Sequence, residues 1–240
     1  MTTDLTFSSF PAGGQAVVIG ASGAIGEAVA RLLRDASPFE RVTGLSRSST
    51  PPLDLTDEDS IARAADATAA ADLPLRLLFD ATGYLHGDHG MPEKSWRQLD
   101  PAALAHAFAV NTIGPALLMK HFLPLLPRNG KSLFATLSAR VGSIGDNRYG
   151  GWYGYRASKA ALNQIVRSAA VELGRKRGEG IVVALHPGTV DSPLSVPFSK
   201  DGLDVRPPDE AAHDLLAVIE GLSQEQSGCF FDYAGEPIPW

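Results

Sequence analysis

Short apolar runs alternate with longer segments of helical periodicity along almost the whole chain. The apolar runs are residues 16–20, 41–45, 75–80, 133–137, 181–186 and 229–232. Between them, apolar residues recur at helical spacing in 24–35, 57–70, 101–126, 152–175 and 208–222. Such alternation predicts an α/β fold, a doubly wound parallel sheet with helices on both faces. Because the runs lack polar alternation, we expect about seven strands that are buried on both sides.

Length and composition narrow the class of protein further. The chain has 240 residues, of which 44% are apolar and 20% charged, and this predicts one globular domain spanning residues 1–240. A formal net charge of −6 with scattered cations argues against nucleic acid or an anionic membrane and favours a small-molecule substrate. The lone Cys229 has no disulfide partner, and we find neither a signal peptide nor a run of about eighteen apolar residues. We therefore expect a cytoplasmic protein.

A glycine-rich turn follows the first apolar run and leads directly into a helical segment. Glycine allows the backbone to turn tightly, and the free amides at a helix start attract an anion such as a pyrophosphate. This position is typical of a Rossmann-type dinucleotide site. The residues expected to hold the phosphates are Gly20, Ser22, Gly23, Ile25 and Gly26.

The end of the second apolar run indicates which dinucleotide binds. A carboxylate would be expected there if the adenosine ribose carried a free 2′-hydroxyl, but the sequence places Ser46 and Arg47 at this point. A guanidinium pairs well with a 2′-phosphate. The pattern favours NADP(H) over NAD(H), the alternative being a solvated surface arginine.

Tyr155 and Lys159 stand four residues apart in the segment 152–175, which places them on one face of a helix. A nearby cation favours phenolate, so we expect Lys159 to lower the pKa of Tyr155 toward neutral pH. Reduction of a carbonyl requires an acid within hydrogen-bond reach of the oxygen. Tyr149 and Tyr153 have no cation at this spacing, so Tyr155 is the candidate proton donor.

Together, these motifs resemble the short-chain dehydrogenase/reductase family, and the chain is most similar to its sniffer-type carbonyl reductase and C-factor branch. The resemblance extends over nearly the whole chain. It rests on the glycine turn, on Leu53-Asp54-Leu55, and on the segments 110–115, 151–159, 186–190 and 228–235. It implies that the single domain combines dinucleotide binding with catalysis and forms a homodimer or homotetramer through the helices starting near residues 101 and 152.

The resemblance also implies roles for individual residues. Lys159 would hold the nicotinamide ribose, and Asn111 would anchor a water that links Lys159 to solvent. Asp54 and Leu55 would meet the adenine. The remaining residues assigned to the cofactor site are Ala81, Gly83, Asn111, Tyr155, Lys159, Pro187, Gly188, Val190 and Ser192.

The sequence departs from the family pattern at three places. Ala139 stands where a catalytic serine is expected, which leaves Ser138 and Ser143 as candidate donors to the substrate oxygen, or neither of them. Ala24 replaces a frequent glycine, and Asp80-Ala81-Thr82-Gly83 replaces the usual Asn-Asn-Ala-Gly.

The sequence therefore supports two hypotheses for the function. The first is an NADPH-dependent carbonyl reductase or alcohol dehydrogenase. The second, motivated by Ala139, is an NADP(H)-binding sensor or signalling protein with little turnover. We expect no metal site, because His86, Asp88 and His89 have no further ligands at a matching spacing.

Overall fold

The computed structural model describes residues 6–36, 38–176, 178–198 and 204–240. Its main sheet is parallel and six-stranded, in the order β2-β1-β3-β4-β5-β8. The strands are β1 (Gln15–Ile19), β2 (Arg41–Leu45), β3 (Leu75–Asp80), β4 (Ser132–Leu137), β5 (Gly180–His186) and β8 (Phe230–Asp232). The predicted doubly wound fold is confirmed, with six strands in this sheet where about seven were expected.

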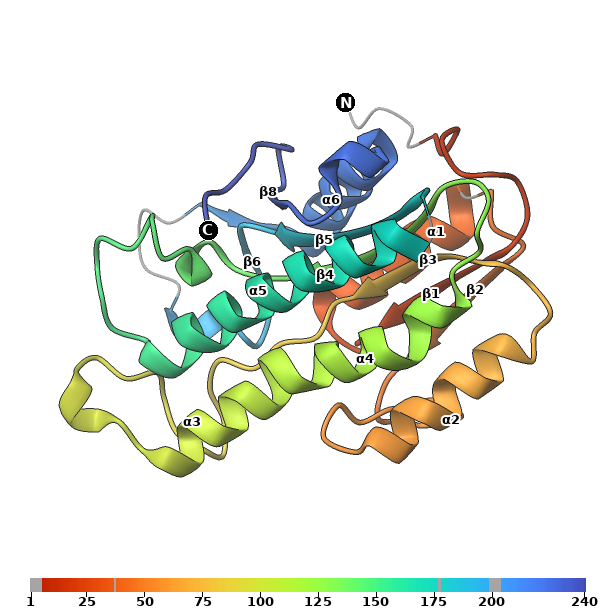
Figure 1. Ribbon diagram of the computed structural model, residues 1–240. Coiled ribbons are helices and arrows are strands. Elements are labelled where there is room, and N and C mark those ends of the chain that lie inside the picture. Colours follow the sequence, from red (N-terminus) through yellow and green to blue (C-terminus); the bar gives the residue numbers. More distant parts are fainter. Residues whose placement is uncertain (1–5, 37, 177, 199–203) are drawn as a thin grey trace.

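Helices cover both faces of the sheet (Figure 1). The helices α1 (Ala24–Ala36) and α6 (Pro208–Gly221) pack on one face, with Val18 in that core. The helices α2 (Glu58–Ala69), α4 (Gly114–Phe122) and α5 (Tyr153–Lys176) pack on the other, with Val17 and Ile19 in that core. Neighbouring strand residues therefore point to opposite faces, which explains the unbroken apolar runs in the sequence.

The segment expected as one helix over 101–126 is divided. Helix α3 (Pro101–Phe108) leads through a π-helical turn, Ala109–Ile113, into α4, and a 3₁₀ turn, Leu123–Leu125, ends the segment. π-helical turns inside α-helices are frequent at functional sites. Asn111 lies in this one and is 1% exposed.

The same segment, Pro101–Leu125, is the one helical stretch among the described residues that is long and apolar enough to cross a membrane by length and composition. His106, Asn111 and Thr112 interrupt its apolar residues, so the sequence shows no continuous apolar run. The stretch is weak evidence for a membrane span, because a core helix of a soluble protein meets the same criteria, and α4 packs on α2 and α5.

A separate pair of short strands lies in the region between β5 and α6. Strand β6 (Thr189–Val190) pairs in parallel with β7 (Val205–Arg206). The pairing joins the two ends of the segment that follows β5, beside the carboxyl edge of the main sheet. Open α/β sheets bind ligands at this edge.

Candidate active site

The turn between β1 and α1 is held by close backbone contacts. Gly20 has a φ of 78°, and the Gly23 amide donates to the Gly20 carbonyl at 2.9 Å. A Cβ at Gly26 would lie 2.2 Å from the Gly20 oxygen, so a side chain there would prevent this approach of α1. Ser22 and Gly23 are exposed at the helix start, whereas Ile25 packs against the core. The cradle and its free amides fit a dinucleotide pyrophosphate.

Ser46 and Arg47 follow β2 at the same edge of the sheet, and Arg47 is exposed. Hydrogen bonds from the backbone and hydroxyl of Thr56 hold the pKa of Asp54 below its usual value, with a smaller contribution from the Arg47 charge. Leu55 is buried in the core on the α2 side. The guanidinium therefore lies within electrostatic reach of the loop expected to meet the adenine.

Tyr155 and Lys159 lie one turn apart near the start of α5. The Lys159 Nζ is 5.9 Å from the centre of the Tyr155 ring and donates to the Leu137 carbonyl at 2.8 Å. Burial raises the pKa of Tyr155 to about 12. The expected lowering of this pKa is wrong for the structure, because desolvation dominates and the ammonium is directed at the end of β4.

Lys159 is itself buried, and its desolvation lowers its pKa to about 8, while the Asp80 carboxylate acts in the opposite direction. Asp80 ends β3 and is fully buried. It accepts hydrogen bonds from the Thr136 hydroxyl at 2.7 Å, the Thr82 hydroxyl at 2.5 Å and the Thr82 amide at 3.1 Å. Asp80, a departure from the family pattern, thus lies within electrostatic reach of Lys159. Ala81 follows it and is partly buried.

Asn111 joins the π-helical turn to the loop after β3. Its Nδ2 donates to the Tyr84 carbonyl at 2.8 Å and to the Ser158 hydroxyl at 3.1 Å, and its Oδ1 accepts from the Tyr84 amide at 2.8 Å. A Cβ at Gly83 would lie 3.7 Å from the Lys159 Nζ and 3.9 Å from the Asn111 Oδ1. The loop after β3 therefore lies close to both Asn111 and Lys159 at Gly83.

The two candidate serines have different surroundings. The Ser138 hydroxyl donates to Asn163 Oδ1 at 2.6 Å. Asn163 lies on α5 two turns beyond the tyrosine, about 12 Å along the helix axis. The Ser143 hydroxyl accepts from the Asp146 amide at 3.1 Å, and no acceptor for its own proton is found in the described part of the chain. Ala139, between the two serines in sequence, is 8% exposed.

A chain of aromatic ring contacts leads from Tyr155 through Trp152 to rings of other segments. The Trp152 ring lies 6.3 Å from Tyr155 and 5.0 Å from Phe198, between ring centres, and Phe198 lies 5.5 Å from His86. His86 Nε2 is also 3.2 Å from the Pro193 carbonyl oxygen. We call Trp152, Phe198 and His86 the aromatic arc. Sequence reasoning did not single out Phe198.

Sequence reasoning also missed Glu93, which holds the start of α5. It is 9% exposed, and its Oε2 accepts from the Gly154 amide at 3.1 Å. Its carbonyl accepts from the Trp152 amide at 2.5 Å, and Trp152 has a φ of 51°, which is uncommon for a bulky residue. Glu93 and Tyr155 both line a cavity of about 20 Å³. Glu93 therefore fixes the backbone on which Tyr155 stands.

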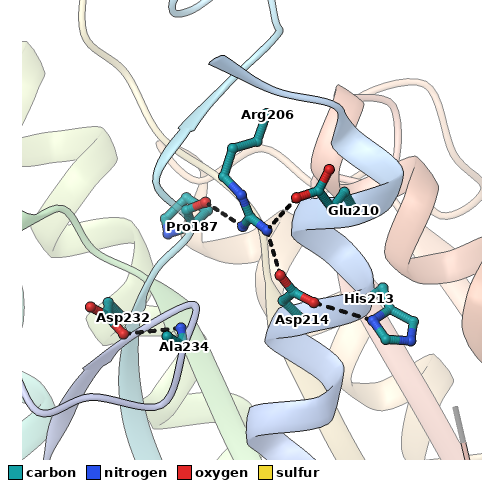
Figure 2. A network of polar contacts seen from close by, with 7 residues as sticks. All are labelled: Pro187, Arg206, Glu210, His213, Asp214, Asp232 and Ala234. Atoms are coloured by element: carbon teal, nitrogen blue, oxygen red, sulfur yellow. Dashed lines mark hydrogen bonds and ion pairs between the residues drawn. The ribbon is translucent and has the colours of Figure 1, made fainter. Parts of the chain in front are cut away.

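The segment after β5 contains the residues expected to line the nicotinamide. Gly188 has a φ of 79°, and Val190 is buried and pairs with β7. The Ser192 hydroxyl donates to the Val190 carbonyl at 3.3 Å. Figure 2 shows the Pro187 carbonyl directed at the guanidinium of Arg206, a residue that sequence reasoning did not identify.

The histidines after β3 make ring contacts. His89 stacks on His106 at 4.1 Å between ring centres, and burial lowers the pKa of His106. Among the residues that the structure describes, no group of three or more His, Cys, Asp or Glu side chains is arranged to hold a metal ion.

Comparison with known proteins identifies relatives along most of the chain. Residues 20–206 match a family model described as enoyl-(acyl carrier protein) reductase. The C-signal protein of Myxococcus xanthus is 40% identical over 143 residues, which cover 59% of this chain and 81% of that protein. A 1-hydroxy-2-glutathionyl-2-methyl-3-butene dehydrogenase of Rhodococcus sp. (strain AD45) is 29% identical over 234 residues, 93% of this chain and 98% of the other.

Solved structures share the fold. An NADPH-bound carbonyl reductase from chicken fatty liver superposes with a TM-score of 0.82 at 27% identity, covering 96% of this chain and all of the other. The carbonyl reductase Sniffer of D. melanogaster gives a TM-score of 0.81 at 22% identity over the same share of each chain.

Proposed function

Because the chain belongs to the short-chain dehydrogenase/reductase family of oxidoreductases, we propose that it transfers hydride between NADPH and a ketone or aldehyde, or the corresponding alcohol. The observation that carries this proposal is the meeting of the glycine turn with Tyr155 and Lys159 at one edge of the sheet. The NADPH-bound chicken carbonyl reductase, which has the same fold at 27% identity, supports the choice of cofactor. The cradle at Gly20 and Gly26 and the exposed Arg47 fit this group.

Each polar residue at the site has a task in the proposed reaction. The bound nucleotide supplies hydride, and Tyr155 donates a proton to the substrate oxygen as negative charge develops there. With its pKa raised to about 12, Tyr155 carries that proton at neutral pH. Lys159 is protonated below about pH 8 and stabilises the phenolate that remains after transfer.

The remaining residues position the substrate and cofactor. Asn111 anchors the water that links Lys159 to solvent. We favour Ser143 over Ser138 as the orienting donor, because the Ser138 hydroxyl already donates to Asn163. The aromatic arc excludes water from the carbonyl. We also propose that the cofactor site and the catalytic residues form one domain in a cytoplasmic enzyme.

A sensor that binds NADP(H) with little turnover is the second candidate. The observations that favour it are Ala139, whose methyl group cannot donate a hydrogen bond, and the 40% identity with C-signal over 143 residues. The partly buried Tyr155 and the buried Lys159 favour the enzyme.

Nucleotide binding and turnover, measured on the wild type and on the Tyr155→Phe variant, distinguish the two candidates. We expect wild-type protein to bind NADPH more tightly than NADH and to reduce members of a panel of aldehydes and ketones. Tyr155→Phe should bind NADPH normally, because the ring is kept. Its kcat should fall at least about a hundredfold, because the hydroxyl that donates the proton is removed. NADPH binding without turnover by the wild type would favour the sensor, and binding of neither nucleotide would refute the cofactor assignment.

We further propose a homodimer or homotetramer formed through α4 and α5. These helices border an apolar groove of about 560 Å³. Beside the groove, Ile113 and Val171 are 52% and 45% exposed. Ala157, Ala160 and Ala161 are small and at least partly exposed on α5, which allows close helix approach.

A further inference from the structure

Arg206 is a buried cation at the end of β7. Its side chain is only 6% exposed. The Nη2 donates to Glu210 at 2.9 Å and also to Asp214, both on α6. Figure 2 shows the guanidinium between these carboxylates and the Pro187 carbonyl, to which Nη1 donates at 3.5 Å. A buried arginine with two carboxylate partners is held firmly, because removal of any partner leaves a buried charge uncompensated.

The backbone of Arg206 holds the same segment from a second direction. Its carbonyl accepts from the Asp191 amide at 2.9 Å, and Val190 is its partner in the β6–β7 pair. Its side chain covers Gly188, where an added Cβ would lie 3.1 Å from the Arg206 Cδ. Arg206 thus contacts or pairs with residues along the whole stretch from Pro187 to Asp191.

A third element, the segment after β8, supports the guanidinium. The Arg206 Cζ lies 4.0 Å from the centre of the Tyr233 ring. Asp232 fixes the turn that carries Tyr233, because its Oδ1 accepts from the Ala234 amide at 3.0 Å (Figure 2). The other Asp232 oxygen accepts from Arg140 at 3.0 Å. Arg206 is therefore where α6, β8 and the segment after β5 meet.

We infer that Arg206 is a positioning residue, which holds the Pro187–Val190 backbone in the shape that receives the nicotinamide half of the cofactor. This inference rests on the proposed function, because Pro187, Gly188 and Val190 are assigned to that half. The phosphate cradle and Arg47 lie on other segments. Loss of the guanidinium should therefore affect one half of the nucleotide and spare the other.

The test compares two nucleotides on Arg206→Met, which keeps an apolar stem and removes the charge. We expect the Kd for NADPH to rise about tenfold, and the Kd for adenosine 2′,5′-bisphosphate, which lacks nicotinamide, to stay within about twofold. For Arg206→Lys, we expect a Kd for NADPH between those of the wild type and Arg206→Met, since an ammonium keeps the charge but does not reproduce the guanidinium fork. Arg31→Met is the matched control, because it removes an exposed arginine paired with Asp209 on α6, and neither Kd should change.

A second pair of variants, at Tyr233, tests the same inference if Arg206→Met fails to fold. Tyr233→Leu removes the ring beneath the guanidinium and should weaken NADPH binding in the same selective way, whereas Tyr233→Phe keeps the ring and should bind as wild type. An equal rise in the Kd values of both nucleotides, or no change in either Kd, would overturn the positioning role. Failure of the wild type to bind NADPH would instead refute the proposed function.

Discussion

At the residue scale, the charge of Lys159 depends on a buried neighbour. Desolvation alone lowers the pKa of Lys159, and the Asp80 carboxylate moves it back toward its usual value, leaving it at about 8. Burial raises the pKa of Asp80, whereas the hydrogen bonds from Thr82 and Thr136 and the charge of Lys159 act in the opposite direction. Lys159 therefore loses its proton close to neutral pH, so its deprotonation should affect the rate of catalysis.

We predict that Asp80→Asn shifts the pH profile of carbonyl reduction. In the wild type, kcat should fall as pH rises through about 8, because Lys159 loses its proton there. Without the carboxylate, the pKa of Lys159 falls further, so the decline should move to lower pH. The measurement is kcat from about pH 6 to about pH 10. Asp66→Asn, an exposed change on α2, should leave the midpoint in place, and an unmoved midpoint in Asp80→Asn would contradict the coupling.

At the element scale, the turn from β1 into α1 depends on a glycine that packs against the turn itself. The α1 helix starts so close to β1 that Gly26 leaves no room for a Cβ beside the Gly20 oxygen. By contrast, a Cβ at Gly23 would lie 3.4 Å from the same oxygen, an ordinary contact. The two glycines share one turn and differ in their steric requirement.

We predict that Gly26→Ala lowers the free energy of unfolding by about 2 kcal/mol, because α1 must move away from the turn. Gly23→Ala should change it by less than about 0.5 kcal/mol. Urea unfolding of the two variants measures the difference. Equal stability of both variants would show that the turn yields to a side chain at either position.

At the scale of the whole molecule, two apolar cores lie on opposite sides of the sheet. The outer surfaces of the two helix layers differ, because α4 and α5 border an apolar groove. The α4–α5 groove is lined by Met119, Leu123, Ile165 and Ala169 among others. On the opposite layer, α6 exposes Ala217. An apolar groove between the two helices proposed as an interface favours association on that side of the molecule.

We predict that Ala169→Arg converts the oligomer to a monomer, because a guanidinium in the groove would lose its hydration on assembly. Ala217→Arg, which adds the same charge to α6, should leave the assembly unchanged. Sedimentation velocity measures the oligomeric state of the wild type and of both variants. A monomeric wild type would refute assembly through this face.

Local pattern in the sequence was sufficient to predict the alternating elements and their order. Strands buried on both faces are mostly apolar, and β3 was predicted with its observed bounds, Leu75–Asp80, although Arg76 and Asp80 are charged. The glycine turn and the Tyr155–Lys159 spacing were equally readable, because each is a short segment whose geometry follows from backbone sterics or helical periodicity.

Only the tertiary structure decided how distant segments complete the candidate site. The Asn111–Tyr84 hydrogen bonds, the β6–β7 pair and the Ser138–Asn163 hydrogen bond all join residues from different segments of the sequence. The direction of the Tyr155 pKa was mispredicted for the same reason: spacing places a cation nearby, but burial and the direction of the Lys159 ammonium depend on the packing of β3, β4 and α5. Desolvation belongs to the assembled core, and no local pattern encodes it.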